Sequence, residues 1–194
     1  MPIFQKLKNK FIKHLDADIV LHLAAFTDVD TAWKQNEDKN GSCYKVNVLG
    51  SKNIAQLCKK YDKYLISIPT DFVFNGLNTP IKGYTEQSQT DPVEWYGKTK
   101  YYSELKINDS KCNYLIFRIA FPFKAKFSNE KLEPIKKIDL VRRIIQKLES
   151  NQIINMFSDQ IITPTFIDDI VNVLNKAMEQ KPKGIFHCVG STSL

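Results

Sequence analysis

The feature that most constrains the fold is a series of short apolar runs separated by longer stretches with the spacing of amphipathic helices. Four runs are predicted as strands, at residues 18–25, 64–68, 113–119 and 184–189. The first is apolar on both faces, as in a strand buried inside a parallel sheet. Strands that alternate with helices favour an α/β fold whose connections cross over between parallel neighbours. We therefore predict an α/β parallel sheet flanked by helices.

The spacing of apolar residues places the predicted helices between and after these runs. The predicted helices cover residues 2–15, 42–61, 96–107, 138–148 and 168–178. Residues 26–40 are predicted as a polar loop or irregular helix, and residues 153–157 and 161–163 as short strand-like pieces. Two long loops remain, at residues 72–95 and 120–134, and loops of this length in a compact domain are usually functional.

Length and composition are those of an ordinary globular chain. At 194 residues, 43% of them hydrophobic, the chain has the size of one domain or most of a larger one. No apolar run reaches the roughly 18–20 residues that a membrane span needs, and the N-terminus lacks the apolar core of a signal peptide. The formal charge is +7, but only three basic residues are Arg and they form no dense cluster. The charge therefore does not indicate a nucleic-acid surface.

Cysteine and histidine usage excludes two further classes of site. The four cysteines are widely spaced, without a C-x-x-C pair, which indicates free thiols in a reducing, cytoplasmic compartment. The three histidines do not stand at ligand spacing from cysteines or acids. We therefore predict no metal site.

The stretch between the second and third predicted strands carries the residues best suited to catalysis. Thr70 follows an apolar strand, and Tyr96 and Lys100 stand four residues apart at the start of a predicted helix, so they share one helical face. A nearby ammonium favours the phenolate and lowers the pKa of the phenol, which suits a Tyr that exchanges a proton with a substrate oxygen. Thr70 can hydrogen-bond the same oxygen. The spacing alone is a weak signal, because Tyr102 and Lys106 repeat it; we interpret that second pair as packing or solvated.

Ligand-facing positions can be predicted from the order of the strands. In open α/β sheets ligands bind outside the carboxyl ends of the strands. The dipeptides that follow three of the predicted strands are Ala24-Ala25, Thr70-Asp71 and Ala120-Phe121. We expect these positions to lie along one edge of the sheet.

Five segments spread along the chain form a recognisable set. They are L-A-A-F-T-D-V-D at 23–30, N-V-L-G-S-K-N at 47–53, T-D-F-V-F-N-G at 70–76, W-Y-G-K-T-K at 95–100 and T-P-T-F-I-D-D at 163–169. In this order they resemble the extended short-chain dehydrogenase/reductase superfamily, and within it the dTDP-4-dehydrorhamnose reductase family with its RmlD-like substrate-binding domain. The resemblance implies a single Rossmann-like, NAD(P)-binding domain over residues 1–194, with a small substrate-binding part at the C-terminal side.

The resemblance also implies an activity and roles for individual residues. It implies NAD(P)H-dependent reduction of a 4-keto nucleotide sugar in dTDP-rhamnose biosynthesis, with NADPH or NADH as cofactor. By motif position, Tyr96 would be the catalytic proton donor, Lys100 would lower its pKa and hold the nicotinamide ribose, and Thr70 would bind the keto oxygen. The implied cofactor-binding residues are Ala24, Ala25, Phe26, Tyr96 and Lys100. The implied substrate-binding residues are Thr70, Asp71 and Phe121.

One element of the family has no counterpart in this sequence. The family begins with a strand, a Gly-rich turn and a helix that hold the cofactor pyrophosphate, whereas the first of the seven glycines here is Gly41 and no two are spaced as G-x-x-G. We therefore expect a domain that is incomplete at both ends relative to the family. We also expect an exposed apolar edge at residues 19–23, which a homodimer or a complementing N-terminal fragment would cover. Binding of NADPH by this polypeptide alone is expected to be weak or absent.

Two other functions remain open at this point. Reductase-like proteins also serve as non-catalytic regulatory subunits, as in the beta subunit of methionine adenosyltransferase, which resembles this family. A nucleotide-sugar epimerase or dehydratase would share the Tyr/Lys pair, although those enzymes usually carry a Ser-rich turn ending in Val-Tyr-Gly where this chain has residues 70–76. The intact set of Thr70, Tyr96 and Lys100 favours descent from an oxidoreductase of the short-chain dehydrogenase/reductase type.

Overall fold

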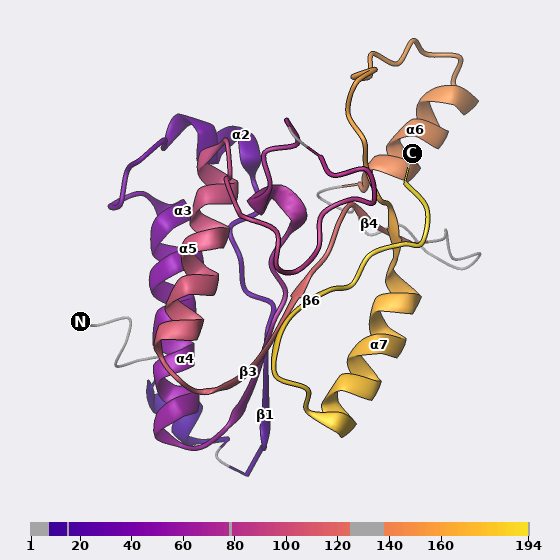
Figure 1. The fold of residues 1–194 in the computed structure, drawn as a ribbon. Helices are drawn as coiled ribbons and strands as arrows, with labels where there is room; N and C mark the ends of the chain where they lie inside the picture. Colours follow the sequence, from indigo (N-terminus) through magenta and orange to yellow (C-terminus); the bar gives the residue numbers. More distant parts are fainter. Residues whose placement is uncertain (1–7, 15, 78, 125–137, 194) are drawn as a thin grey trace. The chain divides into compact units, whose positions relative to one another are not determined.

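The computed structural model describes residues 8–14, 16–77, 79–124 and 138–193. The chain divides into two compact units (Figure 1). The first unit comprises residues 1–118 and 180–187, and the second comprises residues 119–179 and 188–194.

The first unit is built on a parallel sheet with the strand order β1-β2-β3-β6. Its strands are β1 (Ile19–His22), β2 (Tyr64–Ser67), β3 (Asn113–Arg118) and β6 (Gly184–His187). β2 is buried along its whole length and β3 over its last four residues. Among the described strands β1 has only β2 as a neighbour, and its Leu21 is 39% exposed. The predicted α/β fold with a parallel sheet is confirmed.

Two long helical segments pack side by side on one face of this sheet (Figure 1). The first runs through α3 (Ser42–Tyr44), the π-helical turn η1 (Lys45–Gly50) and α4 (Ser51–Lys60), and the second is α5 (Trp95–Asp109). Shorter pieces are α2 (Val29–Lys34) and the 3-10 turn η2 (Asp71–Val73). The predicted helix over residues 42–61 therefore exists, with one π-helical turn inside it. For the predicted helix over residues 2–15, residues 8–12 are helical and residues 1–7 and 15 lie outside the described residues.

The core of the first unit fills the space between the sheet and these helices. Its main cluster is Ala55, Cys58, Leu65, Ile107, Cys112 and Ile116. A second cluster, Ala32, Cys43 and Trp95, lies against Tyr96 and Phe26. The four cysteines are unpaired and buried. Because the second cluster packs under the start of α5, it fixes the first turn of that helix.

The second unit contains two short strands and two helices. β4 (Pro122–Phe123) pairs in parallel with β5 (Thr165–Phe166), and the helices are α6 (Leu140–Glu149) and α7 (Ile167–Gln180). The strand-like pieces predicted at 153–157 and 161–163 are wrong, because both segments are irregular. Their side chains explain the error, since Ile153, Phe157 and Ile161 are 86%, 80% and 69% exposed among the described residues.

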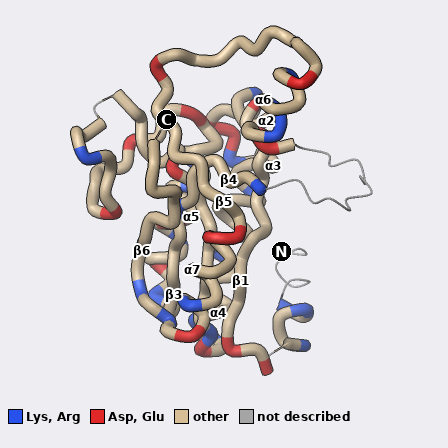
Figure 2. The backbone as a smooth tube through the Cα atoms, turned by 90° about the vertical axis from the view of Figure 1, so that its right-hand side faces the viewer, with Lys and Arg blue, Asp and Glu red and all other residues tan. Residues whose placement is uncertain are grey.

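Charged residues are spread over the backbone rather than gathered on one element. Figure 2 shows Lys and Arg interspersed with Asp and Glu along the described chain. No described helix is long and apolar enough to cross a membrane. Among the same residues, no group of three or more His, Cys, Asp or Glu side chains is arranged to hold a metal ion.

Candidate active site

The carboxyl ends of β1 and β2 and the second turn of α5 enclose a small cavity. The lining residues are His22, Leu23, Ala24, Ala25, Asn47, Ser51, Ser67, Ile68, Lys100 and Ser103. The cavity has a volume of about 10 Å³, which is room for about one water molecule. The structure therefore brings Ala24, Ala25 and Lys100 together at the edge where open α/β sheets bind their ligands.

The start of α5 is fixed by Glu94 and Gly97. The Glu94 carboxylate accepts hydrogen bonds from the backbone N–H groups of Tyr96 and Gly97, each at 2.7 Å, and so satisfies two donors that a helix start leaves free. Gly97 lies against the Phe72 backbone, where a Cβ would be 2.3 Å from the carbonyl oxygen. The missing side chain at position 97 therefore lets the segment after Thr70 approach the helical turn that carries Tyr96.

The Thr70 hydroxyl lies between a carboxylate and a phenol. Its Oγ1 is 3.1 Å from Oδ1 of Asp71, and it also hydrogen-bonds the phenol of Tyr96. The Tyr96 ring packs edge-to-face on Phe72, with the ring centroids 5.9 Å apart. The structure thus brings Thr70, Asp71 and Tyr96 into one hydrogen-bonded group.

The protonation of this group differs from the sequence-based expectation. Burial raises the pKa of Tyr96 to about 12, and the nearby carboxylates of Glu94 and Asp71 raise it further. The expected lowering of this pKa by Lys100 is wrong for the protein as the structure shows it, because Lys100 is not among the groups that shift it and desolvation disfavours the phenolate. Burial also raises the pKa of Asp71 to about 6. At neutral pH Tyr96 is a protonated phenol, which is the form that donates a proton.

Lys100 lies deep in the site beside a buried ion pair. It is 7% exposed, and burial lowers its pKa to about 8, although the Glu104 carboxylate one helical turn away acts in the opposite direction. Glu104 binds Arg118 at two points, Nε to Oε1 at 2.9 Å and Nη2 to Oε2 at 2.7 Å. Sequence reasoning missed Glu104 and Arg118. The available signal was the i, i+4 spacing of Lys100 and Glu104.

His22 faces the same cavity as a neutral side chain. Its Nε2 lies 3.0 Å from Oγ of Ser51. Burial, with a smaller contribution from Lys100, lowers the pKa of His22 to about 4. A neutral imidazole at this place leaves Lys100 as the only described cation that lines the cavity.

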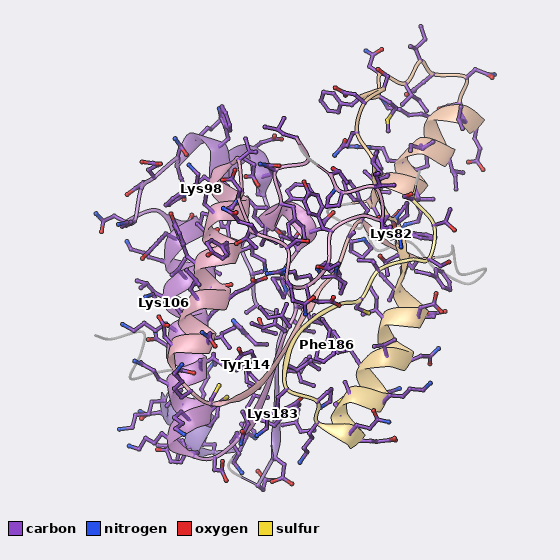
Figure 3. All side chains as sticks on the ribbon, viewed as in Figure 1. Lys82, Lys98, Lys106, Tyr114, Lys183 and Phe186 are labelled. Carbon is purple, nitrogen blue, oxygen red and sulfur yellow. The ribbon has the colours of Figure 1, made fainter. Side chains whose placement is uncertain are left out.

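The second Tyr/Lys pair is placed quite differently. Figure 3 shows Lys98 and Lys106 along the outer side of α5. The Lys106 side chain is 41% exposed and its Nζ lies 3.6 Å from Oδ2 of Asp109, while Tyr102 packs edge-to-face on Trp95 with centroids 6.3 Å apart. The interpretation of Tyr102 and Lys106 as a packing or solvated pair is confirmed.

The loop after β1 is held by a residue to which the sequence assigned no role. Asn47, which is 2% exposed on the π-helical turn, accepts from the Phe26 backbone N–H at 2.8 Å and donates to the Phe26 carbonyl at 3.3 Å. Its amide also donates to Oγ1 of Thr99 at 3.0 Å. Asn47 therefore connects the Phe26 backbone to α5. The signal in the sequence was an Asn inside the predicted helix over residues 42–61.

Phe121 belongs to the second unit. Its backbone has φ of +40°, and its carbonyl accepts from the Thr165 backbone N–H at 3.3 Å. The hydroxyl of Thr165 donates to the carbonyl of Ala120 at 2.7 Å. These contacts fix the β4–β5 pairing, and the role of Phe121 toward a substrate stays a prediction.

Comparison with known proteins identifies the family. Residues 5–194 match the RmlD substrate binding domain. The chain belongs to this family. The resemblance predicted from five sequence segments is thereby confirmed, and the RmlD substrate-binding fold extends over both units of the chain.

Three relatives illustrate the range of this similarity. The chain is 28% identical over 179 residues to dTDP-4-dehydrorhamnose reductase of Mycolicibacterium smegmatis, which covers 91% of this chain and 50% of that protein. It is 28% identical over 198 residues to methionine adenosyltransferase 2 subunit beta of Rattus norvegicus, which covers 97% of this chain and 55% of that protein. The crystal structure of dTDP-4-dehydrorhamnose reductase from Bacillus anthracis in complex with NADP has a TM-score of 0.79 and 26% identity, over 95% of this chain and 60% of that one. The chain therefore spans between 50% and 60% of the length of these proteins.

Proposed function

We propose that this RmlD-type chain carries the proton-donating part of an NAD(P)H-dependent reductase that acts on a 4-keto nucleotide sugar. Two observations support the proposal. Thr70 hydrogen-bonds the phenol of Tyr96, and Lys100, four residues further along α5, lines a cavity together with Ala24 and Ala25. A hydroxyl, a phenol and an ammonium at one edge are what reduction of a carbonyl needs, since the carbonyl oxygen must be held and then protonated.

Each residue of this group has a role that follows from its surroundings. Tyr96 gives its proton to the carbonyl oxygen, and its pKa of about 12 keeps the phenol protonated until that oxygen becomes a strong base. Thr70 reaches the same oxygen because it already hydrogen-bonds the Tyr96 phenol. The Thr70 hydroxyl donates to Asp71 at 3.1 Å, and its single proton turns from Asp71 to the carbonyl oxygen when substrate binds. Lys100, at the cavity wall, contributes a positive charge where negative charge develops.

The described residues fit one end of a nicotinamide cofactor. When bound, NADPH or NADH would supply the hydride. Ala24, Ala25 and Phe26 would contact it through their backbone, of which Asn47 fixes the Phe26 part, and Lys100 would hold the nicotinamide ribose from the cavity wall. A cavity of about 10 Å³ does not by itself enclose a dinucleotide, and the sequence has no Gly-rich turn for the pyrophosphate. We therefore propose that this polypeptide alone binds NADPH weakly or not at all.

Calorimetric titrations with two ligands test the proposal. The chain is expected to bind dTDP-rhamnose, and Thr70→Val is expected to weaken that binding by about tenfold, the effect of one lost hydrogen bond of roughly 1–1.5 kcal/mol. Thr79→Val, in the exposed part of the same loop, is the matched control and should change nothing. Micromolar affinity for NADPH would contradict the cofactor part of the proposal, and no affinity for dTDP-rhamnose would contradict the substrate part.

A regulatory subunit is the second candidate function. The similarity to methionine adenosyltransferase 2 subunit beta extends over 97% of this chain. In that case the chain would bind a methionine adenosyltransferase catalytic subunit and Tyr96 would be dispensable. Co-purification with such a subunit, equal for wild type and Tyr96→Phe, would favour this function over reduction.

A further inference from the structure

Two buried polar atoms at the carboxyl ends of β3 and β6 have no hydrogen-bond partner among the described residues. They are Nη1 of Arg118 and Nε2 of His187. The two residues are register partners on neighbouring parallel strands, so their side chains leave the sheet on the same face. Arg118 is 3% exposed. Buried polar atoms in folded proteins are nearly always paired, so two unpaired ones on one face of a sheet point to a shared partner.

The ring of Phe74 brings the two groups into one place. The Arg118 guanidinium carbon lies 5.2 Å from the Phe74 ring centroid. The His187 ring lies 5.7 Å from the same centroid, at an interplanar angle of 77°. Tyr84 stacks on Phe74 with centroids 4.3 Å apart. Both unpaired atoms are therefore next to the long loop that leaves β2, on the ligand edge of the sheet.

The same loop is fastened to His187. The His187 backbone N–H donates to Oε1 of Glu86 at 2.9 Å. A hydrogen bond between the His187 ring and the backbone of Tyr84 raises the pKa of the ring. Because only an acceptor stabilises the protonated ring, the Tyr84 group is its carbonyl, which accepts a hydrogen bond from a ring N–H. Since the other ring nitrogen is the unpaired Nε2, the proton toward Tyr84 is on Nδ1.

Arg118 and His187 each have one side-chain atom that is still available for a hydrogen bond. On Arg118, Nε and Nη2 are used by Glu104, so Nη1 is left as a donor. On His187, burial lowers the pKa, with Arg118 acting in the same direction and Glu86 against it. A neutral imidazole with its proton on Nδ1 has Nε2 as an acceptor. The site therefore offers one donor atom, Nη1, which carries two N–H groups, and one acceptor atom, Nε2.

We propose that Arg118 and His187 together bind a single hydroxyl group, which accepts a hydrogen bond from Nη1 of Arg118 and donates one to Nε2 of His187. A carboxylate or phosphate oxygen has no proton to give and would satisfy Arg118 alone. Two sources supply such a hydroxyl: an internal water, or a sugar hydroxyl that enters when the covering loop is displaced. The second source rests on the proposed function, and the first does not.

The tautomer of His187 tests the hydrogen-bond roles directly. Long-range ¹H–¹⁵N NMR spectra distinguish the two ring nitrogens, and the chain has three histidines, so His187→Gln assigns the signal by its loss. The expected result at pH 7 is a neutral ring with the proton on Nδ1 and a hydrogen-bonded Nε2. A ring protonated on Nε2, alone or together with Nδ1, would overturn the proposal.

A high-resolution crystal structure, with and without dTDP-rhamnose, identifies the source of the hydroxyl. An oxygen within hydrogen-bonding distance of both atoms in both crystals is an internal water, and its replacement by a sugar hydroxyl in the second crystal is a ligand subsite. His187→Phe keeps a ring against Phe74 and is expected to lose this oxygen, whereas His22→Phe should retain it. An anion or a protein side chain in contact with both atoms would refute the site. These readouts need neither cofactor nor turnover, so they stand apart from the proposed reductase activity.

Discussion

Replacement of Gly97 by alanine tests how the active-site group is brought together. A Cβ at position 97 would lie 2.3 Å from the Phe72 carbonyl oxygen and 2.9 Å from Oε1 of Glu94. Ordinary van der Waals contact begins at 3.4 Å, so the Phe72 carbonyl must retreat by about 1.1 Å, the difference between 3.4 Å and 2.3 Å. That carbonyl belongs to the segment that presents Thr70 to Tyr96.

The expected size of the effect comes from two opposing contributions. Alanine in place of glycine within a helix stabilises by about 1 kcal/mol, whereas forced displacement of packed groups costs about 1–3 kcal/mol. The closest contact at position 97 is with a backbone carbonyl, which moves less readily than the end of a flexible side chain. The destabilisation caused by the displacement should therefore lie near the upper end of the 1–3 kcal/mol range, about 3 kcal/mol. We expect Gly97→Ala to lower the free energy of unfolding by about 1–2 kcal/mol.

The chain offers a matched control at Gly50. This glycine is also helical, and a Cβ there would have its nearest neighbour, the Lys45 carbonyl oxygen, at 3.7 Å. Gly50→Ala should therefore raise the free energy of unfolding by about 0.5–1 kcal/mol. Urea denaturation followed by circular dichroism measures both variants. A Gly97→Ala protein as stable as Gly50→Ala would refute the reasoning that position 97 admits no side chain.

Three further substitutions probe the charges and the sheet edge. Asp71→Asn removes a carboxyl whose pKa burial raises to about 6. The folded wild type binds this proton more tightly than the unfolded chain does, so the stability of the wild type falls as the pH rises from about 4 to about 6. Urea titrations should show the free energy of unfolding of the variant gaining about 2 kcal/mol over that of the wild type across this range. Equal pH profiles would contradict this. Glu104→Gln leaves the guanidinium of Arg118 buried without its counter-charge. In urea denaturation it should lower the free energy of unfolding by about 3–5 kcal/mol, and a decrease of less than about 1 kcal/mol would contradict the ion-pair argument. Leu21→Lys, at the edge of the described sheet, should keep stability within about 0.5 kcal/mol and slow aggregation in light scattering, and unchanged aggregation would mean that this edge is not the associating surface.

The sequence predicted the strands and helices whose apolar residues follow a regular spacing or form a buried run. The runs at β2 and β3 are apolar because both strands are interior, and parallel interior strands bury both faces. The pieces at 153–157 and 161–163 are also apolar but pair with none of the described strands, and apolar composition does not reveal whether a neighbouring strand is present. Strand existence was thus predictable for the four apolar runs that pair in the main sheet.

The site was predictable in its residues but not in its electrostatics. Motif position identified Thr70 and Tyr96, which the structure joins by a hydrogen bond. The direction of the Tyr96 pKa shift could not be predicted, because it depends on how deeply the phenol is buried and on which carboxylates lie beside it in the fold. The Arg118–Glu104 pair was missed for a similar reason, since its two members are joined only when β3 lies beside α5.

The most direct test of Tyr96 as the proton donor compares the turnover of a chimaeric enzyme with that of the same chimaera carrying Tyr96→Phe, which removes only the phenol hydroxyl. This chain covers 50% of dTDP-4-dehydrorhamnose reductase of Mycolicibacterium smegmatis, and in the chimaera the N-terminal part of that protein would be fused ahead of residue 1. The chimaera is expected to oxidise NADPH only when dTDP-4-dehydrorhamnose is present. Tyr96→Phe should lower kcat by at least about 100-fold, with little change in KM and with NADPH binding retained. A chimaera that binds NADPH but turns nothing over, or one whose rate is unchanged by Tyr96→Phe, would contradict the assignment of Tyr96 as the proton donor.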